Sequence, residues 1–247
     1  MPILRLIRGL ILTVLVLFVA PVLASLAWWS VQDRPGSWRD ADWSASGVLP
    51  PAAAVPGARI HVLAARTGGA KGAVAVHSWL VYKRAGDARW TRWEVVGWGR
   101  PVRRDAYAAD ARWYSNAPAV VGTVDGPAAG RLIADIETAI DAYPWRGKGA
   151  YRIWPGPNSN TFVEHVLRVV PEIGVTLPPH AVGRAWLGVG LQAQRDPGGD
   201  LHLSAGGLVG LSVGARTGLE LHLLGQTFGL DLRRPALKLP GIGRVGV

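Results

Sequence analysis

The feature that most limits how this chain can fold is an uncharged run near its N-terminus. Residues 9–29 contain no Asp, Glu, Lys or Arg, and the run is about as long as a helix that crosses the hydrocarbon core of a bilayer. Arg5 and Arg8 precede it, and Trp28 and Trp29 end it at the position of interfacial tryptophans. We therefore expect a transmembrane helix that contacts membrane lipid.

The positive-inside rule orients this helix. It predicts a single-pass protein of the inner (cytoplasmic) membrane, with the main domain on the periplasmic or external side. A cleaved signal peptide is the alternative, because Ser25-Leu26-Ala27 can serve as a cleavage site. The length of the apolar run favours a retained anchor.

Composition narrows the class of protein. The chain has 247 residues, of which 49% are hydrophobic, so it can bury a sizeable core. The net charge of +10 suits a neighbouring anionic lipid or envelope polymer, and without a nucleic-acid-binding motif we expect no nucleic-acid partner. With no cysteine, disulfides, thiolate catalysis and Cys–zinc sites are excluded.

The chain divides into an anchor or signal, a linker, an α+β core and a glycine-rich β extension, at residues 1–31, 32–57, 58–184 and 185–247. Apolar runs in the core predict an antiparallel sheet with strands at 58–64, 73–82, 89–98, 120–124 and 151–154. Two main helices are predicted, one from Asp125 to Tyr143 and one after Pro157. Alternating runs in the extension predict a β-meander at 201–204, 208–213, 219–224 and 228–232. The basic, apolar end at 233–244 is either a membrane-surface segment or a tail packed by its leucines.

The segment Trp154-Pro-Gly-Pro-Asn-Ser-Asn-Thr-Phe162 predicts a rigid turn that opens a helix. Asn158 or Ser159 is the expected N-cap. A hydroxyl at this place meets unpaired backbone N–H groups and the positive end of the helix dipole, which stabilise a nucleophile or an oxyanion. A role in capping alone is equally consistent with the pattern.

His77 is the candidate general base for a Ser159 nucleophile, since a serine hydroxyl needs a base within hydrogen-bond reach. Glu94, on the next strand, is the candidate that orients the imidazole, although the sequence does not fix the register that decides this. We expect the substrate pocket to be lined by Arg152, Trp154, Asn158 and Asn160. A partly buried structural histidine is the alternative for His77, and a solvated charge is the alternative for Glu94.

Two other kinds of site are disfavoured. Gly210-Leu-Ser-Val-Gly214 matches the nucleophile-elbow pattern around Ser212, but a turn and another strand follow it where a helix is required, and no histidine follows Asp231. The six histidines are far apart in sequence and form no metal-binding pair, so we expect no metal. No phosphate-binding loop is present, and we expect no cofactor.

Several blocks together resemble a known family. They are Val76-His-Ser-Trp79, Glu94 to Gly99, Arg112-Trp-Tyr114, residues 151–162 and the ending from Leu219. On these blocks the chain is similar to the bacterial domain-of-unknown-function family 3750, which implies no assigned activity. The order of His77 and the turn at 158–162 also resembles circularly permuted papain-like proteins of the NlpC type. That likeness implies a permuted papain-like core, but Ser159 stands where those proteins usually have cysteine.

Two hypotheses follow. The first is a membrane-anchored serine-type hydrolase or acyltransferase acting on an amide or ester of the envelope, with peptidoglycan or lipid as substrate. The second is a non-catalytic envelope binding or scaffolding protein, in which the serine turn is a degenerate site or only structural.

Overall fold

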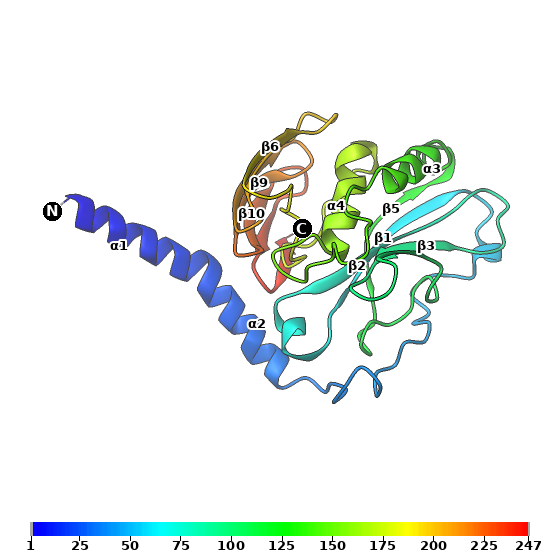
Figure 1. Ribbon diagram of the computed structural model, residues 1–247, viewed down its shortest axis with the longest axis horizontal. Helices are drawn as coiled ribbons and strands as arrows, with labels where there is room; N and C mark the ends of the chain where they lie inside the picture. The colour runs from blue at the N-terminus through cyan, green and yellow to red at the C-terminus, as the bar shows by residue number, and fades with distance from the viewer. Residues whose placement is uncertain (1, 247) are drawn as a thin grey trace.

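The computed structural model describes residues 2–246, in which a long N-terminal helix accompanies two antiparallel sheets and two further helices (Figure 1). The N-terminal helix is continuous and consists of α1 (Pro2–Val14), a wide π turn (Leu15–Val19) and α2 (Ala20–Ser30). Pro21 has no N–H for the carbonyl four residues earlier, and the wide turn accommodates the missing hydrogen bond. Among the described residues, this is the helix whose length and composition suit a membrane span.

A five-stranded antiparallel sheet, in the order β4-β3-β2-β1-β5, forms the centre of the molecule. Its strands are β1 (Arg59–Arg66), β2 (Val76–Lys83), β3 (Thr91–Val95), β4 (Val102–Arg104) and β5 (Ala119–Asp125). The α+β class and the β2–β3 hairpin predicted from the sequence are confirmed. Both faces of β1 and β2 are buried, which explains why apolar residues in these strands occupy both alternating sets of positions.

Two helices cover one face of this sheet (Figure 1). They are α3 (Gly126–Asp141) and α4 (Ser159–Val169), close to the predicted positions. Their apolar stripes pack on the helix side of β1 and β2, and the core there includes Ile60, Val62, Leu80, Ile133, Ile136, Phe162 and Val166. The other face is covered by parts of the linker and of the β4–β5 connection, around Trp79, Val81 and Trp113.

The strand predicted at residues 151–154 is wrong, because this segment is irregular. The Arg152 N–H bonds to the carbonyl of Pro157 at 2.8 Å, inside the same turn, so its backbone is not paired with a sheet. The two prolines at 155 and 157 impose this local closure more strongly than the apolar side chains favour a strand.

The glycine-rich extension forms a separate seven-stranded meander, ordered β12-β11-β10-β9-β8-β7-β6. Its strands are β6 (Leu191–Arg195), β7 (Leu201–Ala205), β8 (Val209–Gly214), β9 (Gly218–Leu223), β10 (Gln226–Asp231), β11 (Ala236–Leu239) and β12 (Gly243–Gly246). Strands β7 to β10 confirm the predicted meander. Of the two alternatives for residues 233–244, the tail is wrong, because six of these twelve residues belong to strands β11 and β12 of the sheet.

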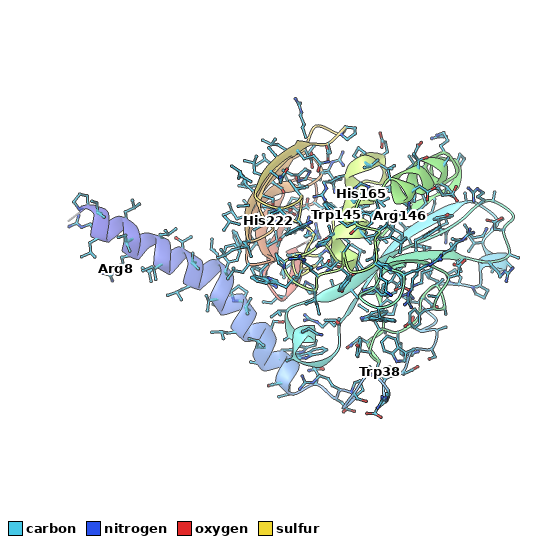
Figure 2. All side chains as sticks on the ribbon, viewed as in Figure 1. Arg8, Trp38, Trp145, Arg146, His165 and His222 are labelled. Atoms are coloured by element: carbon cyan, nitrogen blue, oxygen red, sulfur yellow. The ribbon has the colours of Figure 1, made fainter. Side chains whose placement is uncertain are left out.

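The meander is joined to the rest of the molecule through charged side chains. Arg216, in the β8–β9 turn, and Arg184 lie within 3.7 Å of the carboxylate of Glu164 on α4. Figure 2 shows His222 on this sheet, and its imidazole is buried. The turn Gly69–Ala73 and the β11–β12 turn contact α2, where the Ser25 hydroxyl reaches the carbonyl oxygens of Ala73 and Gly241.

Candidate functional site

Helix α4 begins at Ser159 because Asn158 caps it. The Asn158 Oδ1 accepts the N–H groups of Asn160 (2.9 Å) and Thr161 (3.2 Å), and the Thr161 hydroxyl accepts the Asn158 N–H (3.1 Å). This reciprocal pair is a capping box. Of the two caps that the sequence allowed, the structure has Asn158, and it places Ser159 at the first helical position.

The capping leaves fewer amides for an oxyanion than the sequence suggested. Asn158 occupies the N–H groups of Asn160 and Thr161, and the N–H of Phe162 bonds to the Asn158 carbonyl at 3.0 Å. In the described part of the chain, the Ser159 N–H is the one amide of this first turn that has no acceptor. One backbone donor, not a cluster, is therefore available beside the Ser159 hydroxyl.

Asn160 joins the start of α4 to the start of β2. Its Oδ1 accepts the Ser78 hydroxyl at 2.8 Å, and its Nδ2 donates to the carbonyl oxygens of Val76 (2.9 Å) and Val182 (2.8 Å). These bonds use the side-chain oxygen and both amide hydrogens, so the main role of Asn160 is to connect α4 to β2. The same bonds fix the position of the preceding residue, Ser159, relative to β2.

His77 lies on β2 and belongs to a buried row of polar side chains. Its Nε2 is 2.8 Å from Glu94 Oε2, and Arg92 Nη2 donates to the same oxygen at 2.8 Å. The Trp113 ring stacks on the imidazole with 3.7 Å between centroids and 9° between planes. The structure therefore places Glu94 against His77, in the position where it can orient the ring.

Electrostatics favours an ionised Glu94 beside a neutral His77. Burial lowers the pKa of His77 below its ordinary value, and this outweighs the opposing effect of Glu94. Burial alone would raise the pKa of Glu94, but the hydrogen bond from His77 and the charge of Arg92 hold it below its ordinary value. With Nε2–H donating to the carboxylate, the lone pair of a neutral imidazole is on Nδ1.

His77 and Ser159 line one cavity of about 550 Å³ at the end of β2. Its walls are largely aromatic and include Trp98, Trp113, Tyr114, Tyr151 and Trp154. Within residues 2–246, neither Ser159 Oγ nor His77 Nδ1 has a hydrogen-bond partner. The two groups therefore share the cavity without bonding to each other.

The alternation of β2 explains why the two groups do not bond. Ser78 points toward α4, where it bonds to Asn160, whereas His77 points to the opposite face of the sheet and stacks on Trp113. Ser159 lies at the helix end above the first face. The cavity reaches both residues only because His77 is the second residue of β2, next to the end of the sheet.

The residues predicted to line the pocket have different positions. Trp154, Asn158 and Asn160 line the cavity, although Trp154 Nε1 donates to the Leu224 carbonyl at 3.0 Å. Arg152 is exposed and is not part of the lining described for this cavity. Arg92 is part of the site although no sequence motif marks it, and the alternation of side chains along β3 places it on the same face as Glu94.

A second aromatic cavity of about 540 Å³ adjoins the first. Trp98 and Tyr114 line both cavities, and Trp38, Trp43 and Tyr107 complete the second. Figure 2 shows Trp38 at the margin of the molecule, on the linker. Flat aromatic surfaces of this kind can contact sugar rings or acyl chains.

Ser212, in the disfavoured elbow motif, has histidine neighbours but no access for a substrate. Its hydroxyl is 3.0 Å from His202 Nδ1 and 2.9 Å from His222 Nε2, and His202 Nε2 is 3.5 Å from Asp196. The cavity beside these groups has a volume of about 10 Å³, which is room for about one water. As the sequence indicated, β8 leads into another strand and not into a helix.

Among the described residues, no group of three or more His, Asp or Glu side chains is arranged to hold a metal ion.

A family model described as protein of unknown function (DUF3750) matches residues 57–186. No curated protein and no solved structure matches the chain. The likeness to NlpC-type papain-like proteins therefore rests on the sequence motifs alone.

Proposed function

The chain belongs to the DUF3750 family, and we propose that its cavity is the active site of a serine-type hydrolase or acyltransferase acting on an amide or ester bond of a cell-envelope component. The observation that carries this proposal is the His77–Glu94 pair, 2.8 Å apart, with Nδ1 unpaired in a ring that lines the same cavity as Ser159. A neutral, oriented imidazole that lines the same cavity as an unpaired hydroxyl supplies the two groups that nucleophilic catalysis by serine uses.

The roles follow from these atoms. His77 Nδ1 accepts the proton of Ser159 Oγ as that oxygen adds to the carbonyl carbon of the substrate. The Ser159 N–H donates to the resulting oxyanion. The imidazolium then returns the proton to the departing amine or alcohol, and water or an acceptor hydroxyl releases the acyl group from Ser159. Glu94 stabilises the imidazolium and holds the ring in position.

The walls of the two cavities support a substrate with large apolar or ring-shaped parts. Trp98 and Tyr114 join the cavities into one aromatic surface. Peptidoglycan fragments have sugar rings that stack on such surfaces, and lipids have acyl chains that pack against them. Both candidates carry amide or ester bonds.

We also propose that the protein is retained in the inner membrane by its N-terminal helix, with the main domain on the periplasmic side. Trp29 is buried against the domain, and its Nε1 donates to the Gly69 carbonyl at 3.0 Å. Cleavage near Ala27 would remove Ser25, whose hydroxyl bonds to the domain. N-terminal sequencing of membrane-extracted protein should begin before residue 9, whereas a start near residue 28 would show a cleaved signal.

A Ser159→Cys variant tests the active-site proposal without knowledge of the substrate. The natural chain has no cysteine, so the new thiol can be followed alone. If His77 is within reach, ion pairing should lower the thiol pKa below about 8.5, which alkylation rates measured against pH report. Adding His77→Ala should return the thiol pKa to its ordinary range.

Ser115→Cys, at an exposed loop position, is the matched control and should have an ordinary thiol pKa with or without His77. An ordinary thiol pKa at position 159 that does not respond to His77→Ala would exclude His77 as the base and overturn the catalytic proposal. For the natural protein, the catalytic proposal predicts that a fluorophosphonate labels the hydroxyl of Ser159 and does not label Ser212.

A binding function is the second candidate, and specific contacts favour it. The Ser159 hydroxyl has no bond to His77 within the described residues, and Asn158 occupies two of the amides that an oxyanion would use. A non-catalytic envelope protein would use the aromatic cavities to hold a ligand. It predicts that Ser159→Ala binds muropeptides or lipid as the natural chain does, with no turnover by either protein.

A further inference from the structure

The seven-stranded sheet has its polar side inside and its apolar side outside. Its buried face carries polar and charged side chains, among them His202, Ser212, Glu220, His222, Thr227 and Lys238. The outer face presents a row of aligned apolar residues on β7 to β12: Leu201, Val213, Leu219, Leu230, Leu237 and Val245. A sheet that packs one face on a protein core and exposes the other to water normally has the reverse arrangement.

The buried polar side cannot simply turn outward. The Glu220 carboxylate bonds to Lys238 Nζ at 2.5 Å and to Arg184 Nη2 at 3.0 Å, and Arg216 reaches Glu164 on α4. These partners come from outside the sheet as well as from it. The orientation is therefore fixed by paired charges, and the apolar rows must face away from the domain.

The outer face is extensive. A second aligned row, Leu203, Leu211, Leu221 and Phe228, runs beside the first. In the first row, the exposed fractions of the side chains lie between 40% and 50%, so the row is exposed along its full length from β7 to β12. An apolar surface that crosses six strands marks an interaction site and not the scattered exposure of a soluble protein.

The N-terminal helix identifies what covers this face. The ring of Phe18, in the π turn, is 6.4 Å from the ring of Phe228 on the outer face. In Figure 1 the sheet is the outermost layer on the side from which α1 extends, and α4 lies on the opposite side of the sheet. The free part of the helix and the apolar rows therefore lie on the same side of the molecule, and Figure 2 shows Arg8 on that free part.

We propose that the outer face of β7 to β12 lies on the outer leaflet of the membrane, beside the N-terminal helix, as a second lipid-contact surface. The leucine and valine rows contact acyl chains at the headgroup boundary, and backbone groups between the strands remain paired with one another. Arg233 and Arg234, exposed in the β10–β11 turn, can reach anionic headgroups from the margin.

Spin labelling of the full-length chain in vesicles tests this surface. In the cysteine-free chain, Leu221→Cys places a nitroxide at the centre of the outer face, where the side chain is 42% exposed. Asp87→Cys, in the exposed β2–β3 connection, is the matched control. We expect collisions with oxygen to exceed those with a water-soluble nickel chelate at position 221, and the order to reverse at position 87.

Nickel collisions at position 221 as frequent as at position 87 would show the face in water and overturn the proposal. Dipolar broadening between labels that persists when the protein is diluted in lipid would show a second copy on the face, which also overturns it. Leu219→Cys, in the first apolar row, provides a second position, so that a local disturbance by one label cannot decide the result.

Discussion

Glu94 is the residue whose charge the proposed mechanism most requires. Its Oε2 accepts hydrogen bonds from both His77 and Arg92, while its Oε1 is buried without a partner in the described chain. Buried carboxylates are costly unless their charge is compensated. The arrangement is understandable if the negative charge has a use, and stabilising a protonated His77 during catalysis is such a use.

Replacing Glu94 with Gln tests this role. The amide can still contact His77, but it cannot stabilise an imidazolium by charge, so under the catalytic proposal labelling of Ser159 by a fluorophosphonate should slow by about 100-fold or more. Glu137→Gln removes a carboxylate that pairs with Arg84 away from the cavity and should leave labelling unchanged. Equal rates in all three proteins would contradict a catalytic role for Glu94.

The sequence motifs identify His77 and Ser159 as candidates but do not predict how the two side chains are placed relative to each other. Glu94 shares a face with His77 because Leu80 pairs with Trp93, and this register cannot be predicted from a loop of ordinary turn residues. The stacking of Trp113 on His77 arises from a long loop that no periodicity describes. Nor does chain order tell that His77 points away from α4.

At the scale of elements, the start of α4 is the junction of the molecule. Asn158 closes the turn through its Oδ1, and its Nδ2 donates to the carbonyl oxygens of Ile153 and Val182. Asn160 then ties the same turn to β2. The helix is amphipathic and was predictable for that reason, whereas the network that positions it involves residues that lie far apart in sequence.

Asn158→Ala should destabilise the protein, because it removes the cap of α4 and the side-chain hydrogen bonds to the carbonyl oxygens of Ile153 and Val182. Loss of an N-cap costs about 0.5–2 kcal/mol, and each kcal/mol lowers the thermal midpoint of a chain of this size by about 2–4 °C. Thr138→Ala, at an exposed position of α3, should change it little. Thermal unfolding in detergent compares them, and equal midpoints would show that the turn holds without its cap.

In the meander, the sequence pattern predicts the strands but not which face of the sheet is buried. Alternation in β7 to β10 predicted strands because side chains alternate between two faces. It did not indicate which face is buried, since that depends on Glu164 of α4 and on Arg184, outside the sheet. Strand β6 was not predicted because Leu191-Gln-Ala-Gln-Arg195 has no β-branched or aromatic residue.

At the scale of the whole molecule, the buried polar layer between α4 and the meander makes the protein sensitive to acid. Burial lowers the pKa of His222, in this layer, to about 4, and burial elsewhere, next to β12, lowers that of His180 to about 3, both below the ordinary value of 6.5. Burial opposes ionisation of Glu220 as well, but Arg184 and Lys238 lower its pKa to about 2. In each case the folded protein holds the proton less tightly than the unfolded chain does.

The sign of the pH dependence follows from these shifts. Above pH 6.5 the histidines are neutral in both states, and their stability contribution is fully present. As pH falls from 6.5 to 4 the unfolded chain takes up protons that the folded protein does not, which for fully buried His222 costs on the order of 3 kcal/mol. Glu220 adds a loss of the same sign between pH 4.5 and 2.

We therefore expect the thermal midpoint in detergent to be nearly constant from pH 8 to 7 and to fall steeply between pH 6 and 4. The loss should begin before carboxylates titrate, because histidine protonation of the unfolded chain comes first. A midpoint that stays constant down to pH 4.5 would show that these imidazoles are already charged or solvated in the folded protein. The polar layer would then not be the sealed contact between α4 and the meander that the structure describes.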